Sequence, residues 1–321
     1  MKRTSSKLGW VAAVVVGSGN LLGVASAADV GLPKVKHLID THIHLYDTGR
    51  EGGVPWPPED DKVLYKPHLP AEFRAVSKPT GATGVVVVEA SDIPEDNEWV
   101  LEQAGDDDYF VGLEGNIDPY RDDFEARLVE LSKDARFVGV RARNGGSKKA
   151  VDLADEKVLE SFRVLVKHGK SVDILVNGGG VPAVVSVDRL ARAVPALRIV
   201  VDHVLGYDFD GGAANPEWVA AVEKLGENKN VWCKISGLYQ RSQQQPAPKE
   251  IGFYRPVLEV LWKNLGAERL VFGSNWPCTK ATGDYESFVR VVNAYFAEKG
   301  QEASERYFWK NASEVYRLGL K

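Results

Sequence analysis

Cysteine is scarce in this chain, which has two among 321 residues, Cys233 and Cys278. Two cysteines cannot supply the several bridges that hold together a small disulfide-stapled protein, so the fold must depend on an apolar core. Cys233 falls within an apolar strand-like run, whereas Cys278 follows the end of another. Because such an offset usually exceeds bridging distance, we expect two ordinary buried thiols and no disulfide.

The chain also lacks basic tracts. It carries 40 lysines and arginines against 45 aspartates and glutamates, a net charge of −5. An acidic protein without basic clusters is a poor binder of nucleic acid. We therefore expect a small-molecule substrate as the partner, with neither nucleic acid nor membrane, and the sequence leaves the oligomeric state open.

Long apolar runs occur only near the amino terminus. Three basic residues within the first seven precede an apolar run over residues 8–24, and the small-residue segment Ala25-Ser26-Ala27 follows it. This order is typical of a cleaved secretory signal peptide. We expect residues 1–27 to be that signal, residues 28–321 to form one domain, and the mature protein to be periplasmic or extracellular. Without the signal, 37 basic and 45 acidic residues leave a net charge of −8.

Short apolar runs alternate with segments of helical spacing along the rest of the chain. Strands are predicted at His37–His42, Gly84–Ala90, Tyr109–Gly115, Phe137–Ala142, Ser171–Val176, Arg198–His203, Asn230–Ile235 and Arg269–Gly273. Helices are predicted at Glu95–Gly105, Arg121–Lys133, Asp155–Gly169, Val181–Ala193, Asn215–Leu225, Tyr254–Leu265 and Tyr285–Lys299, with a closing helix at Ser304–Leu318. Eight strands alternating with helices predict a (β/α)8 TIM-type barrel. A doubly wound open sheet is the alternative, but no glycine-rich phosphate loop follows the first strand.

Polar side chains accumulate where these strands are predicted to end. His42 and His44 are two residues apart, so both imidazoles would project from one face of a strand. The other polar residues at strand ends are Glu89, Glu114, Arg141, Arg143, Asn177, His203, Lys234, Ser236 and Asn275. A barrel builds its active site at this end of its strands, so His42, His44 and His203 are predicted to meet at one mouth. Converging neutral imidazoles suit a divalent metal or proton transfer.

Four stretches carry a resemblance to a known family. They are Ile39-Asp40-Thr41-His42-Ile43-His44-Leu45-Tyr46-Asp47, Phe137-Val138-Gly139-Val140-Arg141, Val231-Trp232-Cys233-Lys234-Ile235-Ser236-Gly237-Leu238 and Phe272-Gly273-Ser274-Asn275-Trp276-Pro277. The chain resembles the amidohydrolase superfamily in its amidohydrolase-related (amidohydrolase 2) branch, and there the lactonase group that includes L-fuconolactonase and pyrone dicarboxylate lactonase. The resemblance implies a metal-dependent-hydrolase-like barrel in which water attacks an ester, lactone or amide carbonyl.

This sequence departs from the family pattern at two positions. The family has an aspartate at the end of strand eight that accepts a proton from the attacking water, whereas this chain has Asn275. An amide cannot act as a general base near neutral pH, although it can position water or donate to an oxyanion. The end of strand five, Val176-Asn177-Gly178, offers no histidine, which removes a further metal ligand of metal-dependent relatives.

Two modes of carbonyl activation therefore stay open. His42, His44 and His203 supply the three protein ligands that one catalytic zinc or manganese ion needs, and a binuclear site is not supported. Without metal, Arg141 and Lys234 are the predicted cationic groups that bind the substrate. The structural alternative for Arg141, Arg143 and Lys234 is an internal ion pair with Glu89, Glu114 or Asp202.

The leading hypothesis is an exported hydrolase of a lactone or cyclic ester derived from a sugar, with His42, His44, His203 and Asn275 as catalytic residues. A different class is a non-catalytic sugar- or acid-binding barrel that has lost its base at position 275. A third is a decarboxylase-type lyase, which the resemblance also admits. The sequence does not identify the substrate or the group that replaces the missing base.

Overall fold

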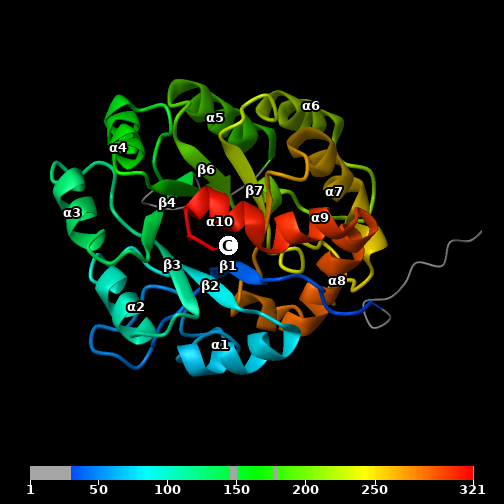
Figure 1. Cartoon of the computed structure of the whole chain (residues 1–321), viewed down its shortest axis with the longest axis horizontal. Coiled ribbons are helices and arrows are strands. Elements are labelled where there is room, and N and C mark those ends of the chain that lie inside the picture. Colours follow the sequence, from blue (N-terminus) through cyan, green and yellow to red (C-terminus); the bar gives the residue numbers. More distant parts are fainter. Residues whose placement is uncertain (1–29, 145–149, 177–179, 321) are drawn as a thin grey trace, which may run out of the picture.

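The computed structural model describes residues 30–144, 150–176 and 180–320 and shows eight parallel strands surrounded by helices (Figure 1). The strands are β1 Ile39–Ile43, β2 Gly84–Val88, β3 Phe110–Gly115, β4 Phe137–Asn144, β5 Ser171–Val176, β6 Arg198–Val201, β7 Val231–Ile235 and β8 Leu270–Phe272. They pair in sequence order, each parallel to the next. The predicted signal peptide lies outside the described residues, so it stays a prediction.

Backbone contacts between β1 and the segment after β8 bring the two ends of the sheet together. Ile43 forms a parallel bridge with Trp276. The Asn275 N–H donates to His42 O at 2.8 Å, and the His44 N–H donates to Trp276 O at 2.8 Å. These bonds confirm the predicted barrel and place the histidine-bearing end of β1 beside Asn275.

The helices form the outer layer. They are α1 Pro70–Ser77, α2 Asp96–Ala104, α3 Phe124–Leu131, α4 Glu156–Lys167, α5 Gly180–Ala193, α6 Pro216–Leu225, α7 Ile251–Leu265, α8 Tyr285–Glu298, α9 Gln301–Glu305 and α10 Asn311–Tyr316. Side-chain caps fix several starts: Asp155 accepts the Lys157 N–H, and Asp284 accepts the Ser287 N–H. Among the described residues, no helix combines the length and apolarity needed to cross a membrane.

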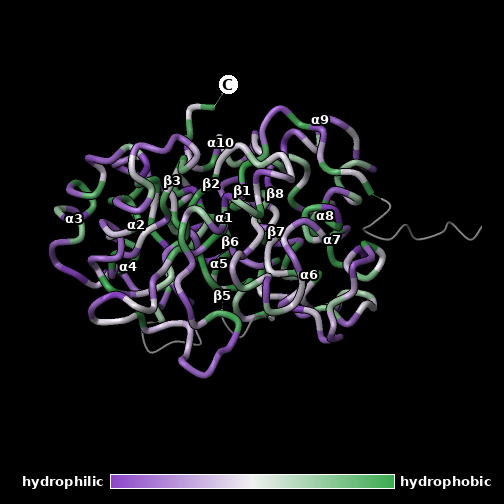
Figure 2. The backbone as a smooth tube through the Cα atoms, turned by 90° about the horizontal axis from the view of Figure 1, so that it is seen from below, coloured by the Kyte–Doolittle hydropathy of each residue, from purple (hydrophilic) through white to green (hydrophobic). Residues whose placement is uncertain are grey.

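Apolar strand residues pack into two buried clusters, and Figure 2 shows hydrophobic segments among the strands at the centre of the molecule. In β2, all four valines are buried, and full burial of one such side chain contributes about 1.5–3 kcal/mol. A second cluster closes one end of the barrel. There α10 and Trp309 contact the first halves of the strands, including Ile39, Val86 and Val200.

Helix α1 was not predicted, several bounds shift by two or three residues, and two elements differ in ways that bear on the two ends of the barrel. The strand predicted to reach His203 ends at Val201, because His203, Val204 and Leu205 all have positive φ (51°, 57° and 54°) and form the turn η3 His203–Gly206. The closing helix predicted over Ser304–Leu318 is divided into α9, a π-helical turn η5 Arg306–Lys310, and α10. That turn lets Tyr307, Phe308 and Trp309 all be buried.

Candidate active site

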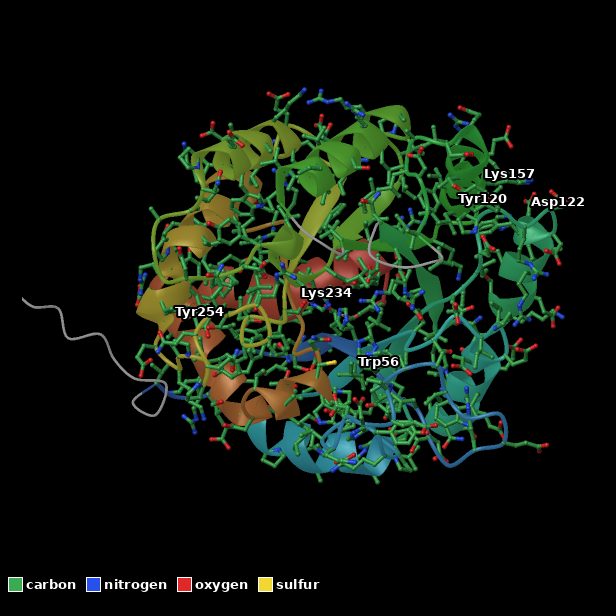
Figure 3. All side chains as sticks on the ribbon, turned by 180° about the vertical axis from the view of Figure 1, so that it is seen from behind. Trp56, Tyr120, Asp122, Lys157, Lys234 and Tyr254 are labelled. Carbon is green, nitrogen blue, oxygen red and sulfur yellow. The ribbon has the colours of Figure 1, made fainter. Side chains whose placement is uncertain are left out.

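Three imidazoles meet at the end of the barrel opposite α10, as the sequence predicted. The ring centroids of His42 and His44 are 5.0 Å apart, and those of His42 and His203 are 4.6 Å apart. His42 lies within β1, His44 directly follows it, and His203 opens η3. Figure 3 shows the molecule from the side opposite Figure 1, with Lys234 labelled near the centre of the barrel. The ring of Trp56 lies 5.6 Å from that of His44.

The hydrogen bond of His44 defines its tautomer. Its Nδ1 lies 3.0 Å from the carbonyl oxygen of Val88, which can only accept, so Nδ1 carries the proton. Burial lowers the pKa of His44 to about 3, and the charge of Arg141 adds to this effect. A neutral His44 therefore presents the lone pair of Nε2, which can accept a proton.

His203 is held by the segment that follows β7. Its Nδ1 lies 2.9 Å from Ser236 Oγ, and its backbone N–H donates to the same oxygen at 3.3 Å. The Ser236 hydroxyl accepts this N–H and can donate its own proton to Nδ1, an arrangement in which His203 carries its proton on Nε2. Burial lowers the pKa of His203 to about 3, so this imidazole is also neutral.

His42 lies in a buried ion-pair network. Its Nδ1 is 3.2 Å from Asp202 Oδ1, and the Lys234 Nζ is 3.3 Å from that oxygen. Lys234 also donates to Asp173. Burial alone would raise the pKa of Asp202, but the charges of Lys234 and Arg141 and the hydrogen bond with His42 outweigh it and hold the pKa well below its usual value. Lys234, predicted to bind substrate, instead has its ammonium group fully buried between two carboxylates.

Two arginines of β4 share one carboxylate. Arg143 Nη2 donates to Glu89 Oε2 at 2.6 Å, and Arg141 Nη1 lies 3.5 Å from Glu89 Oε1. Arg141 also donates through Nε to Asp202 Oδ2 at 3.0 Å. The ion-pair alternative therefore holds for Arg141, which also lines the cavity, and its substrate-binding role stays a prediction.

The cavity at this end has a volume of about 360 Å³. Its lining is His44, Trp56, Ala90, Arg141, Arg143, Leu175, His203, Asn275 and Cys278. Asn275 has a φ of 59° and lies within hydrogen-bonding reach of His44. Cys278 is a free thiol, and so is the fully buried Cys233. A cavity of this size and polarity suits one small polar ring.

The residues also fit a single divalent ion. His42, Asp202 and His203 each offer a ligand atom, and these atoms lie within 4.8 Å of one another. Nε2 of His42 is buried and lacks a hydrogen-bond partner among the described residues, as an atom that awaits a ligand would. His44, predicted as a metal ligand, lies outside this cluster, whereas Asp202 lies in it. The metal role of His44 stays a prediction.

The sequence analysis overlooked Asp173 of β5, which forms a buried ion pair with Lys234 of β7. A signal was present, because a carboxylate within the buried run Ser171-Val172-Asp173-Ile174 requires a cationic or hydrogen-bonding partner. Asn177, which it named at the end of strand five, lies outside the described residues.

Comparison with known proteins gives a consistent result. The amidohydrolase family model (Amidohydro_2) matches residues 39–318. An L-fucono-1,5-lactonase from Burkholderia ambifaria is 28% identical over 285 residues, which cover 87% of this chain and 95% of that protein. A solved amidohydrolase from Burkholderia multivorans with bound zinc aligns with a TM-score of 0.73 at 21% identity, covering 88% of this chain and 99% of that one. A solved putative 2-pyrone-4,6-dicarboxylic acid hydrolase from Pseudomonas putida aligns with a TM-score of 0.70 at 22% identity, covering 89% and 99%.

Proposed function

This chain belongs to the amidohydrolase family, and we propose that it hydrolyses a sugar-derived lactone. The observation that carries the proposal is one cavity in which neutral His44 and His203 meet Arg141. The likeness to an L-fucono-1,5-lactonase over most of both chains supports the choice of a lactone over an amide.

The two histidines have complementary roles in this proposal. Water attacks the lactone carbonyl and transfers a proton to Nε2 of His44, whose other nitrogen is held by Val88 O. Nε2–H of His203 donates to the oxyanion that develops on the carbonyl oxygen. Collapse of the tetrahedral intermediate breaks the ring C–O bond, and the proton on His44 passes to the leaving alkoxide. Asn275 positions the water, and Arg141 binds substrate hydroxyl or carboxylate oxygens.

A divalent ion would fit the same centre through His42, His203 and Asp202; with the ion bound, His203 would serve as a ligand and its Nε2–H at the oxyanion would be replaced by the ion. When bound, such an ion polarises the carbonyl and lowers the pKa of water. Zinc or manganese is the ion we propose. Lys234 and Arg141 both pair with Asp202 and neutralise its charge. This pairing disfavours the binding of a second metal ion at the centre.

The leader-like order of residues 1–27 supports a further part of the proposal, that the enzyme is exported and that residues 28–321 are its mature domain. Expression of the full chain in a Gram-negative host should give periplasmic protein that begins at Ala28. Cytoplasmic protein that keeps its first residues would contradict export.

A lactone panel tests the function. Aldonolactones and aromatic lactones are supplied to purified protein with a chelator, with zinc, or with manganese, and proton release is corrected for spontaneous hydrolysis. We expect hydrolysis of at least one sugar lactone, and a loss in chelator that zinc or manganese reverses. If no lactone is hydrolysed under any of the three conditions, the proposal is overturned.

Asn275 favours one alternative, a binding barrel without catalysis, because the family base is missing there. Asn275→Asp separates the two. The enzyme hypothesis is supported if the natural protein is active and Asn275→Asp leaves that activity unchanged or lowers it. An inert natural protein that becomes active supports the binding barrel, and carbon dioxide release from hydroxybenzoates would instead indicate a lyase.

A further inference from the structure

A second cavity of about 270 Å³ adjoins the active cavity. The two share Arg141 and Arg143 in their walls. The second cavity is lined further out by Asn116, Asp118 and Tyr120 from the segment after β3. A ligand that fills the first cavity therefore has space to extend past the arginine pair.

The wall between the two cavities is well fixed. Arg143 donates to Glu89, which is buried at the end of β2 and also contacts Arg141. Arg141 is held by both Glu89 and Asp202, whereas Arg143 pairs with Glu89 through Nη2, so Arg143 has further N–H groups that can donate to a ligand. Arg143 is thus placed to contact a substrate where it passes from one cavity to the other.

The outer cavity presents an aromatic ring among hydrogen-bonding groups. Tyr120 is 42% exposed, and Figure 3 shows it toward the rim of the barrel, near Lys157. Its backbone N–H donates to Asp118 Oδ1 at 2.9 Å, so the carboxylate and the ring are held as one unit. An exposed aromatic face beside a carboxylate matches the apolar face and hydroxyl edge of a sugar ring.

A third cavity of about 220 Å³ extends the same path toward the surface. It shares Asn116 and Asp118 with the second cavity and adds Arg121 and Arg127. These arginines pair with Asp123 and Glu98, respectively, so they do not make this end a free anion site. The outer path is suited to a neutral, hydroxyl-rich group.

From the adjacency of these cavities we infer that the substrate is a glycosylated lactone, in which the lactone ring fills the inner cavity and a further neutral sugar ring lies against Tyr120. The inference rests on the proposed lactone hydrolysis and adds the size of the substrate to it. It assigns Tyr120 and Asp118 to a second sugar subsite.

The test compares simple aldonolactones with aldobionolactones that carry one more sugar ring on the same lactone. We expect kcat/KM to be at least about tenfold higher for the extended member of one pair. Tyr120→Ala should lower that preference about tenfold, mainly by raising KM for the extended substrate. Tyr120→Phe, which retains the ring, should keep it. Val129→Ala, at an exposed position of α3, is the control for an unrelated surface change.

The outcomes separate this inference from the proposed function. The second subsite is overturned if simple lactones are hydrolysed and the extended lactone of every pair has an equal or lower kcat/KM. Lactone hydrolysis itself would then still hold. A preference for extended substrates that Tyr120→Ala does not alter would also overturn the second subsite. Hydrolysis of neither kind would instead count against the lactonase itself.

Discussion

Asn275 adopts a backbone conformation that few residue types tolerate. Its φ of 59° is left-handed, a region in which asparagine and aspartate are both accepted. Its N–H donates to His42 O, and this bond does not depend on the side chain. Asn275→Asp therefore changes the chemistry of the cavity with little effect on the backbone, which is why the substitution is informative about the base.

Glu114 is a buried acid whose charge the barrel does not accommodate. Ser171 Oγ donates to its Oε1 at 2.6 Å, and burial, reinforced by Asp173, raises its pKa well above the usual value. With Glu114 protonated, the three buried or half-buried cations Lys234, Arg141 and Arg143 balance three carboxylates, those of Asp173, Asp202 and Glu89. Glu114 is thus a neutral donor or acceptor at working pH.

Glu114→Gln should therefore change the pH dependence of stability. Between the unfolded pKa near 4.5 and the raised folded value, the folded state keeps a proton that the unfolded state releases. The free energy of unfolding then falls as pH rises, by at most about 1.4 kcal/mol per pH unit. Urea unfolding from pH 5 to 8 should show the variant gaining stability relative to the natural protein. Parallel curves would contradict the raised pKa, and exposed Glu130→Gln is the matched control.

At the scale of elements, Lys234 connects three adjacent strands. It projects from β7 and pairs with Asp173 of β5 and with Asp202, which directly follows β6, and all three side chains are fully buried. Arg141 of β4 extends the network through Asp202. Breaking one buried pair leaves an uncompensated charge, which typically costs about 3–5 kcal/mol.

Lys234→Met should accordingly lower the free energy of unfolding by several kcal/mol, measured by chemical denaturation. Adding Asp173→Asn should recover part of that loss, because it removes one of the stranded carboxylates. The double variant should lose less than the sum of the two single variants. Additive losses would show that the two residues are not coupled. Lys263→Met, which breaks an exposed pair with Glu223, should cost no more than about 1 kcal/mol.

The contrast between prediction and structure also lies at this scale. Apolar runs such as Val85–Val88 located the strands because burial on both faces leaves a strong signal. The end of β6 was predicted two residues too late, since the chain turns at His203 with positive φ, where its N–H bonds to Ser236, a residue far along the sequence. Lys234 was assigned to the substrate because the sequence does not reveal that Asp173 and Asp202 enclose it.

At the scale of the whole molecule, one end of the barrel holds the candidate active site and the other end is covered by α10. The cavity, with its histidines, arginines and Trp56, lies where the strands finish. Helix α10 lies across the other end, at the centre of Figure 1. The histidines could be predicted to meet, since parallel strands bring their ends together. The cavities beyond Arg143 could not, because loop shape depends on contacts between segments far apart in the sequence.

The closed end is tied to the network under the active site. Tyr316 of α10 donates its hydroxyl to Asp173 Oδ1 at 2.9 Å, and Asn311 Nδ2 donates to Leu270 O at 2.8 Å. Tyr316→Phe leaves one oxygen of a buried carboxylate without its donor, so it should lower the free energy of unfolding by about 1–3 kcal/mol.

A chain that ends at Lys310 should lose cooperative unfolding altogether, since Ala312, Val315 and Tyr316 cover the apolar strand ends. Denaturation followed by circular dichroism and tryptophan fluorescence measures both changes, and a truncated chain that unfolds at the same urea concentration as the full one would show that the barrel does not need its cover.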